Sequence, residues 1–488
     1  MNEKYLRYVR QNRKKIGVSI VIVIFLIALG INIFHIIQSN SSLIPSNKTV
    51  YVAGDGSGNF TCDGNDDQVE INQALAEVAE NPQFSTVHLK GPHTYVISDT
   101  IFIGNDTVLE GDPTAVIELE DNADWPSSKP LITQLDSAGI YGVTIKGFEI
   151  NGNHDKNEDE KRGEGYYNMI YFLNSEDIQV HDMYMHDGHG DGLRVEKSSN
   201  IQFYNNKVYK LGHDGLYAID CQNVEAWNNT ITCRTNSGLR IWNSNHIKFH
   251  DNVIDSFYDW SAGGPGIQIQ KTTSVMNDIE VYNNTIHNTY GPGIWLIGYG
   301  HSYSKEEAQN VYIHHNIFYS TGTNPSIDWV GGIVTSGFDS IIENNVFDGI
   351  YHAAVIHMYP PSSTGLDNSI DLSPRGTGYK TIVCNNIIVD TQKRPKDSNE
   401  TGYAVINYLP STHTFVLENN CLYNNVGGNY KNANSTTDLY VNPLFVNQSK
   451  HDYHLKSNSP CIGAGYTSPD SSKELGEGGH QINIGRYS

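Results

Sequence analysis

Apolar and polar residues alternate in short runs that recur every 23 residues through the middle of the chain. One run in each unit begins with an aliphatic residue, at Ile178, Ile201, Val224 and Ile247. Another follows a glycine, in the tetrads that begin at Gly192, Gly215 and Gly238. A repeat of this length is typical of a solenoid, in which each unit buries its apolar side chains only against neighbouring units. Because the runs alternate and are too short for helices, they predict an all-β fold, a parallel β-helix.

Polar pairs, mostly Asn-Asn, mark one fixed point in each unit and continue after the 23-residue spacing ends. From Asn252 the steps to the following pairs are 32, 32, 29, 41 and 34 residues, ending at Asn420. The added residues fall between the runs, and insertions of this kind cluster on one face of a solenoid and often line a binding site. A corner asparagine bonds to its own turn and to the amide of the next coil. We therefore interpret the pairs, and His314-His315 at the same point, as structural.

The N-terminal 37 residues have the pattern of a membrane anchor. Residues 1–15 contain six lysines and arginines, and residues 16–37 are almost entirely apolar. The apolar stretch is long enough to cross a bilayer as one transmembrane helix, and the basic tail is expected to remain in the cytoplasm. We therefore expect a single-pass signal-anchor in the cell membrane, a polar linker at 38–49 and an extracellular domain beyond it. A cleaved signal peptide is the alternative.

Residues 50–488 are predicted to form the β-helix domain. The spacing of Val69, Ile71, Leu75 and Val78 predicts an amphipathic helix over 66–80. An open solenoid end needs a cap, and this helix precedes the first coils. Residues 440–488 are expected to form the corresponding cap at the C-terminal end.

Charge and cysteine content narrow the classes of function. The sequence has 32 basic and 54 acidic residues, a formal net charge of −22, which argues against nucleic acid as a partner. Its six cysteines show no metal-binding spacing, and the sequence leaves their pairing open.

The glycine tetrads align a row of outward-facing side chains. Their aliphatic residues alternate and should point inward, so the residues between them point outward, one coil or about 4.8 Å apart. Guanidinium groups hold carboxylates and aromatic rings pack on pyranose rings, which suits an acidic polysaccharide. The row is therefore a candidate substrate-binding groove, and its members are Arg194, Tyr217, Arg240, Gln268 and Trp295.

Two carboxylates precede this row on adjacent coils. Asp191 and Asp214 are 23 residues apart, whereas the next coil has Ser237 at the same point. Like charges this close raise the pKa of one carboxyl, which can then stay protonated as a general acid. Paired carboxylates are what glycoside hydrolysis needs. We therefore expect Asp191 and Asp214, with Asp187 nearby, to be catalytic residues of a hydrolase.

Histidines in the same loops leave other mechanisms open. In a uronate lyase or C5-epimerase, His189, His213 or Tyr217 would act as the base while one of the two arginines neutralises the uronate carboxylate. Ca²⁺ held by the carboxylate pair is a further alternative, although no metal site is assigned. A non-catalytic cell-surface protein that binds matrix is the third alternative, because a solenoid alone serves that purpose.

The beginning of the domain resembles a known family. The segment Tyr51-Val-Ala-Gly-Asp-Gly-Ser-Gly-Asn-Phe-Thr-Cys-Asp-Gly-Asn-Asp-Asp is similar to the opening of the methanogen disaggregatase family. The segment Thr107-Val-Leu-Glu-Gly-Asp resembles the pectate-lyase-like superfamily of right-handed parallel β-helix proteins. The resemblance implies an extracellular depolymerase acting on methanochondroitin, a matrix glycan that contains uronate and N-acetylgalactosamine.

Overall fold

The computed structural model describes residues 48–126, 129–157, 167–234, 236–255, 264–271, 276–298, 311–325, 329–358, 379–394, 401–411, 413–465 and 482–487. The basic tail at 1–15, the expected membrane span at 16–37 and the linker up to residue 47 lie outside these residues. None of the helices in the described part of the chain has the length and hydropathy of a membrane span.

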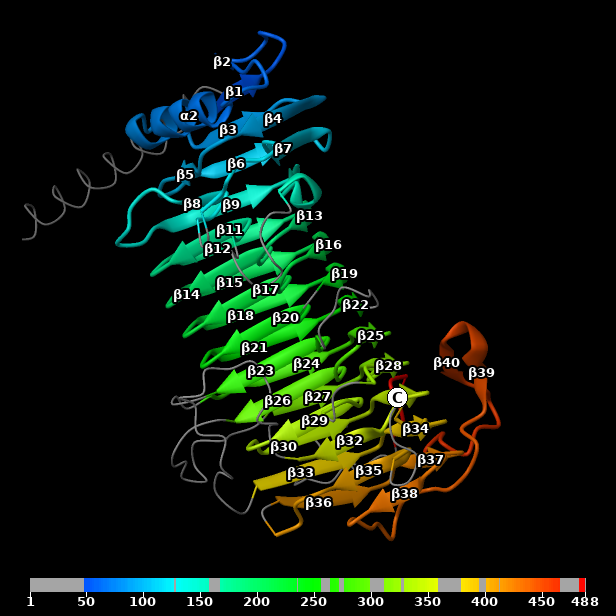
Figure 1. The fold of residues 1–488 in the computed structure, drawn as a ribbon. Coiled ribbons are helices and arrows are strands. Elements are labelled where there is room, and N and C mark those ends of the chain that lie inside the picture. The colour runs from blue at the N-terminus through cyan, green and yellow to red at the C-terminus, as the bar shows by residue number, and fades with distance from the viewer. Residues whose placement is uncertain are drawn as a thin grey trace, which may run out of the picture.

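The described residues form a parallel β-helix, as the sequence predicts (Figure 1). Three long sheets run along the solenoid, and each regular coil contributes one strand to each sheet. Neighbouring strands within a sheet pair in parallel, for example β14 with β17 and β17 with β20. We name the three sheets A, B and C in the order in which the chain visits them.

The strands have the following bounds. Sheet A has fourteen strands, β2 (Phe60–Thr61), β1 (Thr49–Ala53), β3 (Thr86–Leu89), β6 (Val108–Gly111), β9 (Tyr141–Lys146), β12 (Glu176–His181), β15 (Ser199–Tyr204), β18 (Gln222–Trp227), β21 (Asn245–His250), β24 (Ile279–Tyr282), β27 (Val311–His314), β30 (Ser340–Glu343), β33 (Tyr379–Cys384) and β36 (His413–Glu418). Sheet B has twelve, β4 (His93–Ile97), β7 (Ala115–Leu119), β10 (Glu149–Asn151), β13 (Tyr184–Gly188), β16 (Lys207–Leu211), β19 (Thr230–Arg234), β22 (Val253–Asp255), β25 (Thr285–His287), β28 (Ile317–Tyr319), β31 (Val346–Asp348), β34 (Ile387–Val389) and β37 (Cys421–Tyr423). Sheet C also has twelve, β5 (Ile101–Ile103), β8 (Ile132–Gln134), β11 (Ile170–Leu173), β14 (Leu193–Glu196), β17 (Leu216–Ile219), β20 (Leu239–Trp242), β23 (Ile267–Lys271), β26 (Ile294–Gly298), β29 (Ile333–Ser336), β32 (Ala353–His357), β35 (Tyr403–Asn407) and β38 (Gly428–Lys431).

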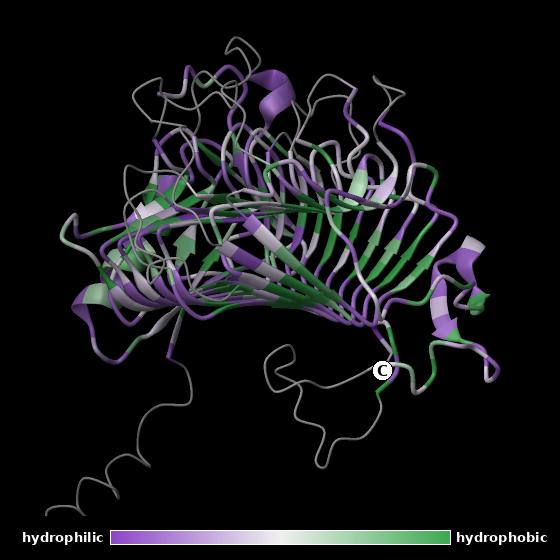
Figure 2. Ribbon diagram, turned by 90° about the horizontal axis from the view of Figure 1, so that it is seen from below, coloured by the Kyte–Doolittle hydropathy of each residue, from purple (hydrophilic) through white to green (hydrophobic). Residues whose placement is uncertain are grey.

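The aliphatic residues of the tetrads fill the interior. Leu193, Leu216 and Leu239 are in register on successive coils, and all three are fully buried. Figure 2 shows the same segregation along the solenoid, with hydrophobic segments concentrated in the strands and hydrophilic ones at the corners and loops. The tetrad glycine is required by a close approach of backbones. A Cβ atom at Gly192 would lie 2.7 Å from the carbonyl oxygen of Gly215, so only glycine fits there.

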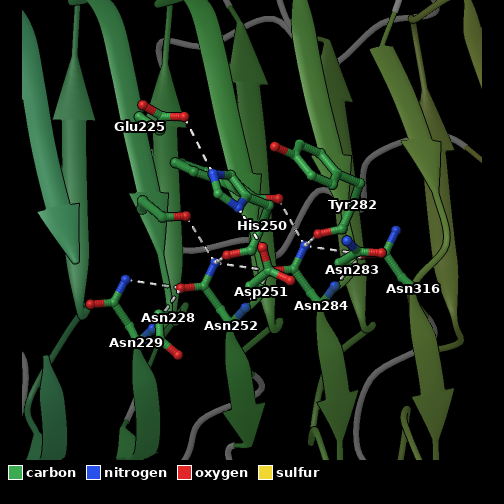
Figure 3. Close-up of polar contacts among 12 residues, drawn as sticks. Glu225, Asn228, Asn229, His250, Asp251, Asn252, Tyr282, Asn283, Asn284 and Asn316 are labelled. Atoms are coloured by element: carbon green, nitrogen blue, oxygen red, sulfur yellow. Dashed lines mark hydrogen bonds and ion pairs between the residues drawn. The ribbon is translucent and has the colours of Figure 1, made fainter. Parts of the chain in front are cut away.

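The Asn pairs form the corner between sheets A and B (Figure 3). The first residue of each pair has a left-handed backbone, as at Asn228 with φ of 53° and Asp251 with φ of 55°. The second bonds to the neighbouring coils: the Asn252 amide Nδ2 donates to the carbonyl oxygen of Ala226 at 2.9 Å, while its backbone N–H donates to Oδ1 of Asn284 at 3.0 Å. The structural interpretation of the pairs is confirmed. His315 occupies the left-handed position of the same corner, with φ of 54°.

Aromatic rings also stack along the outer face of sheet A, a feature that the periodicity did not lead us to single out. Ring centroids of Tyr204 and Trp227 are 4.2 Å apart and nearly parallel, and those of His250 and Tyr282 are 4.6 Å apart. Because neighbouring rings cover each other's faces, this stack offers edges to solvent and is not a platform for sugar rings.

The two ends of the solenoid differ. The helix expected over 66–80 corresponds to α2 (Gln68–Glu80), which buries Ile71, Leu75 and Val78 against the first coils. At the other end, residues 439–465 and 482–487, which we call the return segment, fold back along the outside of sheet B and include the antiparallel pair β39 (Phe445–Asn447) and β40 (Asp452–Leu455) (Figure 1). Its contacts reach coils far from the end: Tyr453 donates to Asp348 at 2.9 Å, and Arg486 donates to the carbonyl oxygen of Asn283 at 3.2 Å.

Candidate active site

The candidate catalytic carboxylates lie at the corner between sheets B and C. Asp191 follows β13 and precedes β14, and Asp214 has the same place one coil later, between β16 and β17. One oxygen of each carboxylate accepts the backbone N–H of the next coil: Asp191 Oδ1 from Asp214 at 2.9 Å, and Asp214 Oδ1 from Ser237 at 2.6 Å. Asn168 bonds to the backbone of Asp191 in the same way at 3.0 Å. The pair is therefore part of a corner ladder whose first and last members are uncharged.

A histidine is held between the two carboxylates. His213 Nδ1 lies 2.6 Å from Asp191 Oδ1 and 3.1 Å from Asp214 Oδ2. Both aspartates are buried, whereas 19% of the His213 side chain remains exposed. The ring nitrogen Nε2 faces the side-chain amide of Asn236 at 3.0 Å. Because two carboxylate oxygens lie beside Nδ1, the proton of a neutral imidazole is favoured on Nδ1. The other ring nitrogen, Nε2, points away from the two carboxylates.

Two arginines complete the charge balance. Arg240 lies 3.4 Å from Asp214 Oδ2 and donates to Gln270 at 2.9 Å. Arg194 lies 3.8 Å from Asp191 Oδ2 and bonds to Glu196 at 2.7 Å. The Tyr217 ring is between the two guanidinium groups, with the Arg194 and Arg240 carbons 5.0 and 4.3 Å from its centre.

These neighbours separate the pKa values of the two carboxyls. Burial favours the neutral form of Asp191, but the nearby His213 and Arg194 outweigh it, so the pKa of Asp191 is lowered. The pKa of Asp214 is raised, because its burial and the Asp191 charge outweigh His213 and Arg240. Burial also opposes the charged form of His213, yet Asp214 and Asp191 raise the pKa of this imidazole. The arrangement thus holds one ionised carboxylate, one carboxyl that retains its proton more readily, and an imidazole between them.

The predicted row of outward-facing side chains has the predicted register. Arg194 pairs with Tyr217, Tyr217 with Arg240, Arg240 with Gln268, and Gln268 with Trp295 on successive strands of sheet C. The last four side chains are buried, and Arg194 is the member that stays half-exposed. The expectation of an open groove along the whole row was therefore too broad.

The far end of the row belongs to an apolar cluster. Trp295 stacks on Trp329 with ring centroids 4.1 Å apart, and both pack with Val334 and Ile356. Gln268 accepts a hydrogen bond from Ser237 Oγ at 3.1 Å and donates to Gln270 at 2.9 Å. These residues support the charged group and one another, and the surface they offer to a ligand is small.

Asp187 and His189 bond to other partners. Asp187 contacts His186 at 2.6 Å and Lys210 at 2.8 Å. His189 stacks on His154 with centroids 4.1 Å apart, and burial beside that ring lowers the pKa of His189 to about 4. The sequence analysis placed Asp187 and His189 near the two carboxylates because both closely precede Asp191 in the chain. The chain turns before it reaches Asp191, so these two side chains contact other partners.

The charged group does not suit calcium. Ligand atoms of Asp191, His213 and Asp214 lie within 4.8 Å of one another, so the three could in principle share an ion. Ca²⁺ prefers six to eight oxygen ligands, whereas here a histidine nitrogen and two arginines already face the carboxylate oxygens. A proton shared among Asp191, His213 and Asp214, together with the two arginines, accounts for the close approach of these side chains.

Asn236 contacts the imidazole of His213, and the sequence analysis did not single it out. It follows His213 by 23 residues, so the period places it beside that histidine on the next coil. The 23-residue spacing could have identified it, but the sequence analysis considered only the Asn pairs, and Asn236 does not belong to one.

The comparisons with known proteins agree with this architecture. A family model described as "Disaggregatase related" matches residues 276–472, and one described as "Right handed beta helix region" matches residues 168–347. The search of curated proteins found no match. The charged group therefore lies within the β-helix match and precedes the disaggregatase-related match.

Solved structures share the fold at low identity. The catalytic unit of a GH87 alpha-1,3-glucanase from Streptomyces thermodiastaticus is 17% identical, with a TM-score of 0.54, 77% of this chain covered and 66% of that one. A second GH87 alpha-1,3-glucanase catalytic domain is 14% identical, with a TM-score of 0.50 and coverages of 82% and 69%. The mannuronan C-5 epimerase A-module of Azotobacter vinelandii is 14% identical, with a TM-score of 0.46 and coverages of 78% and 96%. Similarity at this level concerns the fold alone. The chain is thus similar to the disaggregatase-related family over residues 276–472 and to right-handed β-helix proteins over residues 168–347.

Proposed function

We propose that the protein is a disaggregatase-like enzyme that cleaves an acidic polysaccharide, with His213 as its proton-transfer group. The observation that carries the proposal is the imidazole held 2.6 and 3.1 Å from two buried carboxylates beside a half-exposed arginine. Burying two carboxylates and an arginine costs free energy that the corner does not require, since neutral residues hold it in the adjacent coils. Such clusters are characteristic of sites that move protons.

Hydrolysis is the first chemistry we propose for this group. The raised pKa of Asp214 and the lowered pKa of Asp191 assign the proton-holding and the ionised role to different carboxyls. Because both carboxyls are buried, His213 would pass the proton between them and the glycosidic oxygen or the attacking water. The substrate class is a glycan of uronate and N-acetylhexosamine, such as methanochondroitin, whose carboxylates Arg194 would bind.

Lyase or C5-epimerase chemistry on the same glycan is the second candidate. It is favoured by the exposure of His213 next to Arg194, because a base beside the C5 proton and a cation on the uronate carboxylate are what that reaction needs. Tyr217 is less suited as the base, since burial raises the pKa of its hydroxyl. A membrane-anchored, extracellular location, expected from residues 1–37, belongs to the same proposal.

The test is a product analysis. Residues 45–488 are incubated with purified methanochondroitin, and product size and ultraviolet absorbance are followed together. Shorter products without new absorbance indicate hydrolysis, and shorter products with the absorbance of an unsaturated uronate indicate a lyase. A polymer of unchanged length and absorbance whose uronates have changed configuration at C5, read by NMR, indicates an epimerase. A polymer unchanged in length, absorbance and configuration that binds the protein would contradict the enzyme proposal and favour a matrix-binding surface protein.

A further inference from the structure

The outward-facing row of sheet C continues on the N-terminal side of the charged group. Arg194 pairs with Tyr171 one coil earlier, Tyr171 pairs with Thr133, and Thr133 pairs with Phe102. The alternation that points Arg194 outward therefore points these three side chains outward as well. We call Phe102, Thr133 and Tyr171 the open row. From Arg194 to Phe102 the row crosses three coils, about 14 Å at the usual spacing of strands.

The open row is accessible from solvent. Phe102 is 39% exposed, and Thr133 and Tyr171 are half-buried. Leu135 follows Thr133 by two residues on the same side of the chain, and it is 58% exposed. Large apolar side chains are usually buried on folding, so an exposed apolar strip that leads to a charged group indicates a binding surface.

On the C-terminal side of Arg194 the same row is closed. Tyr217 lies between the guanidinium groups of Arg194 and Arg240, and both Tyr217 and Arg240 are buried. Further along, Trp295 is covered by the stacked ring of Trp329. A ligand that followed the row in this direction would have to displace these packed side chains. The charged group can therefore be reached along the row from its N-terminal side.

The open row and Arg194 together offer the groups that an acidic sugar chain requires. Aromatic rings pack on the apolar faces of pyranose rings, and a guanidinium group binds a carboxylate. Burial and the charge of Glu196 raise the pKa of Tyr171, and the opposing effect of Arg194 is smaller. The Tyr171 hydroxyl therefore keeps its proton and can donate a hydrogen bond to a sugar oxygen beside Arg194.

We propose that the polysaccharide lies along the open row and enters the charged group with one chain end. This inference rests on the proposed function and specifies how its substrate binds. Sugar rings pack on Tyr171 and Phe102, and a uronate carboxylate near the chain end binds to Arg194. Because the row is closed beyond this point, the rest of the polymer extends toward the N-terminal end of the solenoid. Depolymerisation then removes short products from the chain end and leaves internal bonds intact.

The first test counts the protein molecules that bind to each polysaccharide chain. The His213→Asn protein, which should not degrade the polymer, is mixed to saturation with two size fractions of purified methanochondroitin, and the complexes are weighed by light scattering. Binding of one chain end predicts one protein per chain in both fractions. Absence of binding, or a number of proteins that increases with chain length, would overturn the proposal.

Matched variants locate the bound chain on the protein. Phe102→Ala and Tyr171→Ala should each weaken binding of methanochondroitin by roughly 2–10-fold, the effect of losing one aromatic contact. The control is Tyr209→Ala, at a ring that is 37% exposed on the outer face of sheet B, and it should bind as the wild-type protein does. Unchanged binding in both open-row variants, or weaker binding in Tyr209→Ala, would count against this path. Thermal unfolding checks that the variants are folded.

The reaction of the wild-type protein separates this inference from the proposed function. Attack at a chain end predicts short products from the start while most of the polymer keeps its size in size-exclusion chromatography. A rapid fall in the size of the whole polymer would support cleavage but overturn binding by one end. A polymer that stays intact, with one protein bound per chain, would contradict cleavage and support the open row.

Discussion

Two corners of the same solenoid bury polar side chains in similar ladders, yet they differ in charge. At the corner between sheets A and B, each asparagine uses both ends of its amide: Asn229 donates to Phe203 and Asn252, and accepts from Asn206. At the corner between sheets B and C, Asp191 and Asp214 use one oxygen for the backbone of the next coil. Their second oxygens face His213 and the arginines.

The difference shows what each corner needs. A neutral amide satisfies the backbone without the desolvation cost of a charge, and this suffices over the many coils of the first corner. At the second corner Asn168 and Ser237 take the equivalent positions in the adjacent coils, so the ladder alone does not require a carboxylate. The charge is present in two coils where it meets an imidazole. That local departure from the repeat is the strongest structural sign of a function.

The largest expected effect is on His213. His213→Asn places there the residue that the next coil has at Asn236, so the corner should fold normally. If the imidazole transfers protons, activity should fall by about 10²–10⁴-fold, and this is measured as the initial rate of polysaccharide depolymerisation. His246→Asn, at an exposed histidine on sheet A, serves as the control and should keep full activity. Full activity in His213→Asn would remove the imidazole from the mechanism.

The next largest effect is expected when Asp and Asn are exchanged between the two corner ladders. Asp191→Asn and Asp214→Asn preserve an oxygen for the backbone N–H of the next coil and should each lose at least about 100-fold in rate with little change in fold. The reverse exchange, Asn229→Asp, should leave the candidate active site unaffected. It should instead destabilise the protein by on the order of 2–5 kcal/mol, because a buried carboxylate would face the carbonyl oxygen of Phe203.

Thermal unfolding and depolymerisation rates, measured on the same three proteins, check the exchange. The expected pattern is activity lost at one corner and stability lost at the other. Equal stability losses at both corners, with activity retained in the Asp variants, would mean that Asp191 and Asp214 are turn residues only.

The sequence predicted most features of the two corners because the repeat is regular in the coils that form them. A strict spacing of 23 residues fixes which side chains lie one coil apart, so the ladder of Asn206, Asn229 and Asn252 and the pairing of Arg194 with Tyr217 and Arg240 follow from counting. The alternation of the strands also assigns Leu193 and Leu216 to the interior without ambiguity. These are properties of backbone register, which periodicity determines.

Burial and corner geometry could not be predicted in the same way. Asp187 has a left-handed backbone with φ of 52°, and this turn redirects the chain between His186 and Asp191. Counting residues therefore placed Asp187 and His189 too near the pair. Trp295 has the expected register, but its partner Trp329 lies in a long, irregular insertion that no repeat specifies. Side chains that depend on such insertions need the three-dimensional structure.

The two arginines of the charged corner should differ in their contribution to the stability of the protein. Arg240 is buried against Asp214, so Arg240→Ala should cost about 3–5 kcal/mol in unfolding free energy by removing one of the two cationic partners of this buried carboxyl, the other being His213. Arg194 is half-exposed, so Arg194→Ala should change stability little and weaken substrate binding. Thermal unfolding and glycan-binding assays on both variants check this. The reverse pattern would indicate that Arg240 is the substrate ligand.

The smallest expected effect is a shift in the pH dependence of activity. It measures the electrostatic interaction of His213 with Asp191 and Asp214. Asp214 and Asp191 raise the pKa of His213 above its ordinary value of 6.5 despite the opposing effect of burial. The resulting contribution to stability is complete below pH 6.5 and is lost as the pH rises through the raised pKa. Activity that requires the neutral imidazole should increase through the same pKa.

Asp191→Asn removes one of the two charges that raise this pKa. The acidic limb of the pH–rate profile should therefore move to lower pH, by on the order of one unit, in whatever activity the variant retains. Asp187→Asn, which lies close in sequence but bonds to His186 and Lys210, is the matched control and should leave the limb in place. A limb that moves equally in both variants would show that the shift reflects the general acidity of this face. A limb that moves only in Asp191→Asn would show that the charged corner sets the protonation of His213.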